Sequence, residues 1–131
     1  MTTTDRLRYQ LTQTLIRTQA GLAGYLQLRQ AKGYMSYMSV SENDALRENL
    51  FALYREIHDG MLPMKNSLVP AEREAWRQTA DAIASAVVCL MTGEHDSPSY
   101  IAVNVGQLTD CLKSLTRSIA RLNALTASTH A

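Results

Sequence analysis

The chain has 131 residues, of which 46% are hydrophobic and 19% are charged, and this balance is typical of one globular domain with a hydrophobic core. A formal net charge of +1 argues against a partner recognised by bulk charge, although a local patch of one sign is compatible with it. With two cysteines, no signal-peptide layout and no apolar run near the roughly 20 residues of a membrane span, the sequence predicts a cytoplasmic protein without a disulfide scaffold.

The first predicted element is a helix over about residues 5–32. Leucines recur at three- and four-residue steps from Leu7 to Leu26, which places them on one helical face. Gly33 is a natural stop, because glycine adopts the left-handed conformation without a steric penalty. Gly21 and Gly24, inside the helix, have two interpretations: another helix packs closely against them, or they are tolerated with a slight bend.

The segment between Gly33 and Val40 is interpreted as a linker. It holds a tandem repeat, Tyr-Met-Ser-Tyr-Met-Ser, at positions 34–39. Flexible methionine side chains suit adaptable binding surfaces, and gap filling beneath a loop is the alternative. The candidate interaction residues of this segment are Tyr34, Met35, Tyr37 and Met38.

A second helix is predicted over about residues 42–60. Ser41 opens it in a sequence that resembles a capping box. Pro63 removes a backbone donor and clashes with the preceding turn, so an end or a kink is expected near residues 59–62. The apolar stripe consists of Leu46, Leu50, Leu53 and Ile57, widened by Phe51 and Tyr54.

A third helix is predicted over about residues 71–92, from Pro70 in the first turn to Gly93 as the stop. Near its C-terminal end, apolar residues occur on every side of the helix. About half of each helix in a four-helix protein faces the core. The surplus of apolar residues, those that cannot face the core, is therefore either covered by a loop or forms an oligomer interface. We expect a homodimer with Val88 and Met91 near its interface.

Residues 100–105 resemble a short extended stretch, too short to form a sheet alone. Asn104 is a good cap for a last helix over about residues 105–126. Four amphipathic segments joined by short connections predict a single all-α domain over residues 1–131, folded as an antiparallel up-and-down four-helix bundle.

The sequence contains no recognisable catalytic motif or phosphate-binding loop, so we predict neither enzymatic activity nor a cofactor. A zinc site formed by Cys89, His95 and Cys111 is conceivable, but the spacings match no standard pattern. Both cysteines lie beside apolar residues, so they are expected to be small core residues and no metal is predicted.

Charge is distributed unevenly along the chain. Residues 1–40 carry five basic and one acidic residue, whereas residues 41–100 carry five basic and ten acidic residues. The first and last helices of an up-and-down bundle are neighbours, so the surface is expected to have a basic and an acidic side. A basic stripe at four-residue steps on the last helix is interpreted as a solvated face, with nucleic-acid contact as the alternative. It comprises Lys113, Arg117 and Arg121.

Several longer segments of the sequence carry a resemblance to a known family, namely residues 25–36, 40–42, 55–59, 86–93, 95–96 and 111–116. In these segments the chain resembles the BssR family of small enterobacterial biofilm regulators, and the likeness covers most of the chain from about residue 20 to 123. It implies a cytoplasmic regulator that represses biofilm formation and influences the uptake and export of indole and the quorum autoinducer, as well as catabolite-repression and stress genes. It implies no catalytic residues.

Three hypotheses for the mechanism remain open at this point. The first is a helical module that binds an unidentified protein partner. The second is direct binding of DNA through the basic stripe and the first helix. The third is a sensor of small, indole-like molecules, with a pocket between helices near Trp76 or near Gly21 and Gly24.

Overall fold

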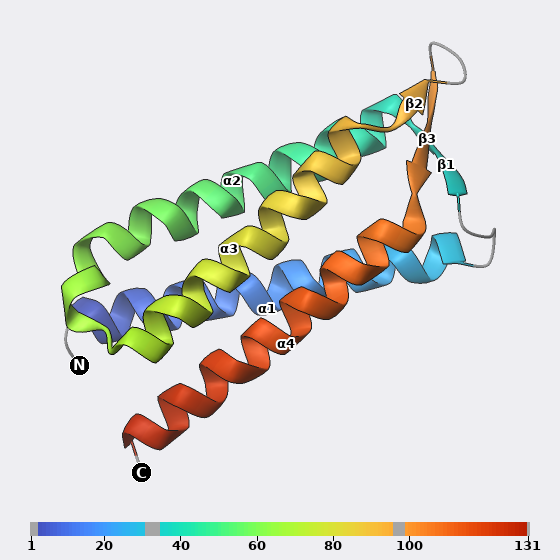
Figure 1. Cartoon of the computed structure of the whole chain (residues 1–131). Coiled ribbons are helices and arrows are strands. Elements are labelled where there is room, and N and C mark those ends of the chain that lie inside the picture. The colour runs from blue at the N-terminus through green and yellow to red at the C-terminus, as the bar shows by residue number, and fades with distance from the viewer. Residues whose placement is uncertain (1–2, 31–34, 96–98, 131) are drawn as a thin grey trace.

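The computed structural model describes residues 3–30, 35–95 and 99–130. Its main elements are four long helices, and successive helices run in alternate directions (Figure 1). The first helix packs against the second and the fourth, and the third helix also packs against both of these. The predicted helical bundle is therefore confirmed. The helices are α1 (Thr3–Gln30), α2 (Val40–Met64), α3 (Pro70–Met91) and α4 (Val105–His130).

One continuous hydrophobic core draws on all four helices. The predicted leucine face of α1 is buried, and Trp76 of α3 is the largest of the fully buried side chains. Because α1 and α4 are neighbours, the two basic segments of the chain lie together, as the charge pattern predicts. The most deeply buried apolar side chains of α2 and α4 are Leu50, Leu53, Ile57, Met64, Val105, Leu108, Leu115, Ile119 and Leu122.

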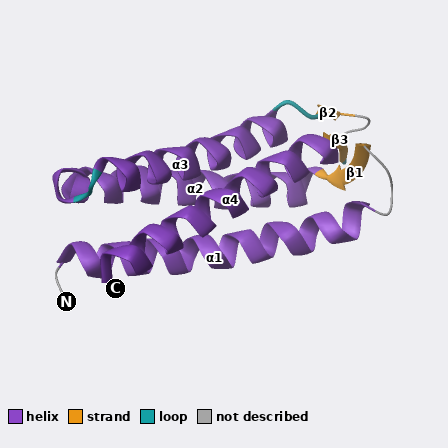
Figure 2. Ribbon diagram, turned by 60° about the horizontal axis from the view of Figure 1, so that its bottom comes forward, coloured by secondary structure: helices purple, strands orange, loops and turns teal. Residues whose placement is uncertain are grey.

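A small antiparallel sheet joins the two connections at one end of the bundle (Figure 2). Its strands are β1 (Met35–Ser39), β2 (Glu94–His95) and β3 (Tyr100–Asn104), with β3 in the middle. In the register, Met35 lies opposite Asn104 and Ser39 opposite Tyr100. The interpretation of residues 33–40 as a linker was wrong where β1 forms, whereas the extended stretch expected at residues 100–105 is confirmed as β3. Neither strand could form a sheet alone, but the bundle brings them side by side.

Two strand ends cap the helices that follow them. The backbone N–H of Glu42 donates to Ser39 Oγ at 3.1 Å, and that of Gln107 donates to Asn104 Oδ1 at 3.0 Å. The predicted Asn104 cap is thus confirmed. The placement of the helix start at Ser41 was wrong, because α2 already begins at Val40.

The end of α2 lies further along the chain than the sequence predicts. The helix runs through Gly60 to Met64, followed by a short 3-10 turn, η1 (Lys65–Ser67). Of the two alternatives for residues 59–62, an end or a kink, the end was therefore wrong. Pro63 falls in the last turn, where it removes the N–H that would donate to the Asp59 carbonyl, and the helix ends one residue later. Gly60 faces α1, and a Cβ added there would lie 3.1 Å from Leu11 Cδ1.

The glycines have different roles. Nothing lies within 4 Å of a Cβ added at Gly21 or Gly24, so these positions are tolerated glycines and no helix packs closely against them. The third helix ends at Met91 and not at Gly93, with the N–H of Thr92 donating to the Val88 carbonyl. A Cβ at Gly93 would lie 2.8 Å from the Ala102 carbonyl oxygen. Glycine is therefore required at position 93 for the close approach of β3.

A largely buried ion pair links α1 to α3 at the opposite end of the bundle. Arg8 Nε donates to Glu72 Oε1 at 2.6 Å and Arg8 Nη2 donates to Glu72 Oε2 at 3.3 Å. The side chains are 14% and 5% exposed, and Arg8 also binds Asp5. Glu72 lies in the first turn of α3, where the helix dipole favours a negative charge.

The contact of Gly93 with β3 predicts opposite effects for two glycine substitutions. Gly93→Ala should lower the free energy of unfolding by about 1–3 kcal/mol, because the added methyl collides with backbone that cannot yield easily. Gly24→Ala, in open space within a helix, should raise it by about 0.5–1 kcal/mol. Urea denaturation of both variants checks this, and a neutral Gly93→Ala would refute the close approach.

The Arg8–Glu72 pair should stabilise the fold more than any exposed pair of the described residues. Glu72→Gln should lower the free energy of unfolding by about 3 kcal/mol, because it leaves Arg8 poorly compensated in a largely buried position. Arg77→Gln, which breaks exposed pairs with Glu74 and Asp81, is the matched control and should have a much smaller effect. Chemical denaturation at neutral pH measures both, and equal effects would contradict the prediction.

Candidate binding surfaces around the third helix

The interaction residues predicted in the tyrosine–methionine repeat do not form one exposed surface. Met38 is 1% exposed, and its Sδ accepts a hydrogen bond from the Tyr25 hydroxyl at 3.1 Å. Its assignment to a surface was wrong, because the pairing of β1 with β3 places it over the core. Met35 and Tyr37 lie in β1, although their side chains are outside the described part of the structure, as is the whole of Tyr34.

The predicted surplus of apolar residues on α3 lies on the surface. Val88 is 57% exposed and Met91 is 63% exposed. Phe51 of α2, at 50% exposure, lines a hollow of about 430 Å³ together with Val87 and Met91. Val88 lines a different groove, between α3 and α4, so the two predicted interface residues do not line the same hollow. We call Phe51 and Met91 the α2–α3 patch.

Sequence reasoning missed the role of Phe51. It was assigned to the apolar stripe of its helix, yet Leu50 and Leu53 occupy the core positions. Residue 51 is rotated by about 100° from residue 50 on a helix. The heptad spacing of the leucines therefore already indicated that Phe51 lies beside the core-facing stripe and not within it.

Charged side chains surround the α2–α3 patch. Arg47, Glu48 and Arg55 line the same hollow as Phe51 and Met91, and Arg47 Nη2 lies 3.3 Å from Asp44 Oδ1. An apolar centre with a charged rim is the usual layout of a protein–protein interface.

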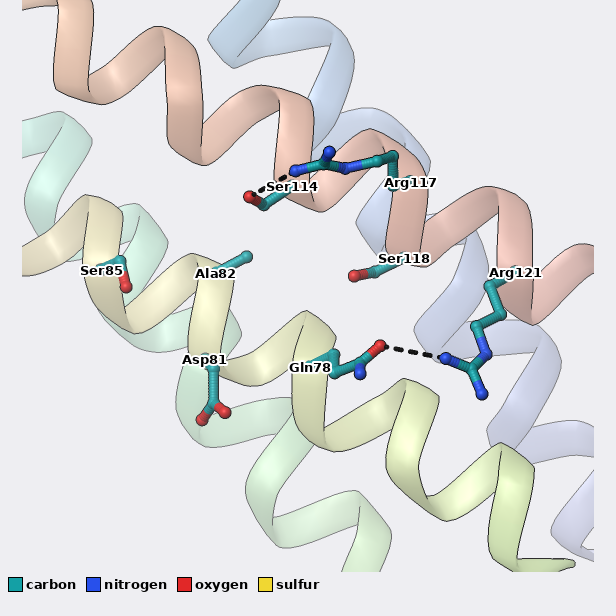
Figure 3. Close-up of a pocket in the computed structure, with 8 residues that line it drawn as sticks. All are labelled: Gln78, Asp81, Ala82, Ser85, Ser114, Arg117, Ser118 and Arg121. Atoms are coloured by element: carbon teal, nitrogen blue, oxygen red, sulfur yellow. Dashed lines mark hydrogen bonds between the residues drawn. The ribbon is translucent and has the colours of Figure 1, made fainter.

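The predicted basic stripe on α4 is divided between two environments. Arg117 and Arg121 line a groove of about 480 Å³ between α3 and α4, whereas Lys113 is exposed and does not line it. Arg117 Nη2 donates to Ser114 Oγ at 3.3 Å, and Arg121 Nη1 donates to Gln78 Oε1 at 3.5 Å (Figure 3).

Acidic residues of α3 lie next to this groove. Arg77 Nε donates to Glu74 Oε2 at 3.0 Å and Arg77 Nη1 donates to Asp81 Oδ2 at 2.7 Å. The pKa of Glu74 is lowered, chiefly by the hydrogen bond from Arg77 and further by the charges of Arg77 and Arg121. The stripe therefore faces a wall that carries carboxylates, which does not favour a long polyanion such as DNA.

The two thiols lie in a second groove of about 610 Å³, which continues from Asp81 and Ser85 towards the sheet end of α3 and α4. Both cysteines are free, and burial is the main cause that raises the pKa of each. The pKa of Cys89 reaches about 11, with a contribution from Cys111. Both thiols are therefore protonated at neutral pH, unlike metal-ligating or catalytic thiolates.

The described residues contain no group of three or more His, Cys, Asp or Glu side chains that could hold a metal ion. His95, the third residue of the conceivable zinc site, lies in β2, but its side chain is outside the described part. The Cys89 thiol donates a hydrogen bond from Sγ to the Asn104 carbonyl oxygen at 3.6 Å.

The small-molecule pocket predicted near Trp76 is not lined by the Trp76 side chain. Trp76 is 0% exposed, and its Nε1 has no hydrogen-bond partner among the described residues. Gly21 and Gly24 are on the open surface. Within residues 3–30, 35–95 and 99–130, no helix is both long and apolar enough to span a bilayer.

Comparisons with known proteins place the chain in a family. A family model described as "Biofilm formation protein (YliH/bssR)" matches residues 2–130. Biofilm regulator BssR of Escherichia coli K12 is 48% identical over 118 residues, which cover 90% of this chain and 91% of the relative. The proteins of the same name from Escherichia coli O157:H7 and Shigella flexneri have the same identity and coverage. No solved structure matches the chain. The chain belongs to the YliH/BssR family of biofilm formation proteins.

Proposed function

We propose that this chain is a non-enzymatic cytoplasmic regulator that represses biofilm formation by binding a protein partner through the α2–α3 patch. The regulatory role is supported by 48% identity, across 90% of the chain, to relatives named biofilm regulators. Effects on indole and autoinducer transport, and on catabolite-repression and stress genes, would then be consequences of that contact.

The α2–α3 patch is the observation that carries the protein-binding part of the proposal. Its two side chains are each at least half exposed, on helices that bury other large apolar side chains in the core. Removing such surface from water yields roughly 25 cal/mol per Å², so a partner that covers the patch gains affinity from it.

The charged rim of the patch limits which partners fit. Arg47 and Arg55 stand beside Glu48, so a partner needs an apolar anchor with charges of both signs around it. Such a rim contributes more to specificity and association rate than to affinity. A second copy of the chain also satisfies these requirements, and the predicted homodimer would then use the same patch.

Met91→Glu should abolish repression of biofilm formation without unfolding the protein. The test expresses the chain in an Escherichia coli strain that lacks its own BssR and measures surface-attached biomass by crystal violet staining. The wild-type chain should lower the biomass, whereas Met91→Glu should leave it at the level of the empty vector, because a buried charge at the contact opposes docking.

Tyr9→Glu is the matched control, since Tyr9 is 61% exposed on α1, away from the patch, and it should repress as the wild type does. Thermal unfolding of the purified proteins confirms that both variants fold. Full repression by Met91→Glu would contradict a role for the patch. Light scattering of the wild type and Met91→Glu shows whether a second copy occupies it.

A further inference from the structure

The groove between α3 and α4 has the properties of a small-molecule site, separate from the α2–α3 patch. Its volume of about 480 Å³ exceeds the size of a single inorganic ion. Figure 3 shows side chains from both helices around it, with Arg117 and Arg121 on one wall and Gln78 on the other. Its lining is completed by Asp81, Ala82, Ser85, Ser114 and Ser118.

The two guanidinium groups retain most of their hydrogen-bonding capacity. Each has five N–H donors, and the hydrogen bonds within the described part of the chain use one on each: Arg117 with Ser114, and Arg121 with Gln78. Both acceptors are neutral, and within the described part of the chain neither arginine forms an ion pair. Two positive charges one helical turn apart thus stand at the groove without a direct ion pair, although Arg121 lies near enough to Glu74 to interact with its charge.

A serine hydroxyl at the floor of the groove supplies a second observation. Ser118 is 7% exposed as a residue, and its side chain extends into the groove in Figure 3. Its oxygen is not among the buried unpaired polar atoms of the described residues, so the hydroxyl is accessible from the groove and available to a bound molecule.

The carboxylate of Asp81 does not neutralise the groove. It is bound by Arg77 Nη1 at 2.7 Å, and in Figure 3 it is turned away from Arg117 and Arg121. The charge that a ligand meets between the helices is therefore set by the two arginines.

We propose that this groove binds a small hydrophilic molecule that carries a phosphate group. A phosphate offers several oxygens to two guanidinium groups at once, and Arg–phosphate hydrogen bonds are charge-assisted. The serine hydroxyls and the Gln78 amide suit a polyhydroxylated body, for which the volume leaves room beside the phosphate. This site does not depend on the proposed protein contact, since it shares no residue with the α2–α3 patch.

The test titrates the full chain with inorganic phosphate, glucose 6-phosphate and glucose at constant ionic strength, followed by NMR of the arginine side-chain Nε–H groups. Both phosphates should shift the signals of Arg117 and Arg121 saturably, with glucose 6-phosphate binding more tightly, and glucose alone should not bind. Arg117→Gln and Arg121→Gln should each weaken binding about tenfold or more, because each removes a charge-assisted hydrogen bond.

Lys113→Gln is the matched control, because it removes the same charge from the same stripe but lies outside the groove. It should leave the affinity for glucose 6-phosphate within twofold of the wild type. An equal loss in Lys113→Gln, or equal shifts with acetate at the same ionic strength, would overturn the proposal in favour of unspecific attraction.

A parallel titration with duplex DNA distinguishes binding of a small phosphate ligand from binding of a nucleic-acid backbone. At low ionic strength, DNA binding that is weakened alike by Lys113→Gln, Arg117→Gln and Arg121→Gln would overturn the proposal and assign the stripe to nucleic acid. All substituted side chains are exposed, so the variants are expected to fold, and thermal unfolding verifies this.

Discussion

The antiparallel pairing of β1 with β3 is the constraint on which the arrangement of this bundle depends. It ties together two connections that are about 65 residues apart in the sequence, with Met35 opposite Asn104 and Ser39 opposite Tyr100. The ends of the paired strands are also the caps of α2 and α4. The same few residues therefore decide where two of the four helices begin, and the antiparallel register fixes those two starting points at opposite ends of the strand pair.

The other end of the bundle is held by a different kind of interaction. Arg8 and Glu72 connect α1 and α3 through a two-pronged, largely buried ion pair. Between these two ends the helices are joined by side-chain packing around Trp76 and the leucines. Backbone pairing at one end and a charged contact at the other thus fix the alignment of helices whose apolar faces alone would tolerate sliding.

The third helix contributes to both candidate surfaces because it packs between α2 and α4. Its α2 side carries Met91 of the α2–α3 patch, and its α4 side carries Gln78 and Ser85 into the groove with Arg117 and Arg121. A partner on the patch and a ligand in the groove would contact the same helix, α3, from two sides. This gives a regulator a physical means of linking the two events.

The sequence by itself determined the four helices, the Asn104 cap and the surplus of Val88 and Met91, because helical periodicity and capping depend on residues a few positions apart. The basic stripe was also predictable, since a four-residue step places side chains on one helical face. Only the tertiary structure decided the sheet, the burial of Met38 and the exposure of Phe51. It alone also turned two arginines of the stripe towards a groove and left Lys113 outside. These features depend on contacts between segments far apart in the chain, and local spacing carries no information on which segments the packing of the core brings together.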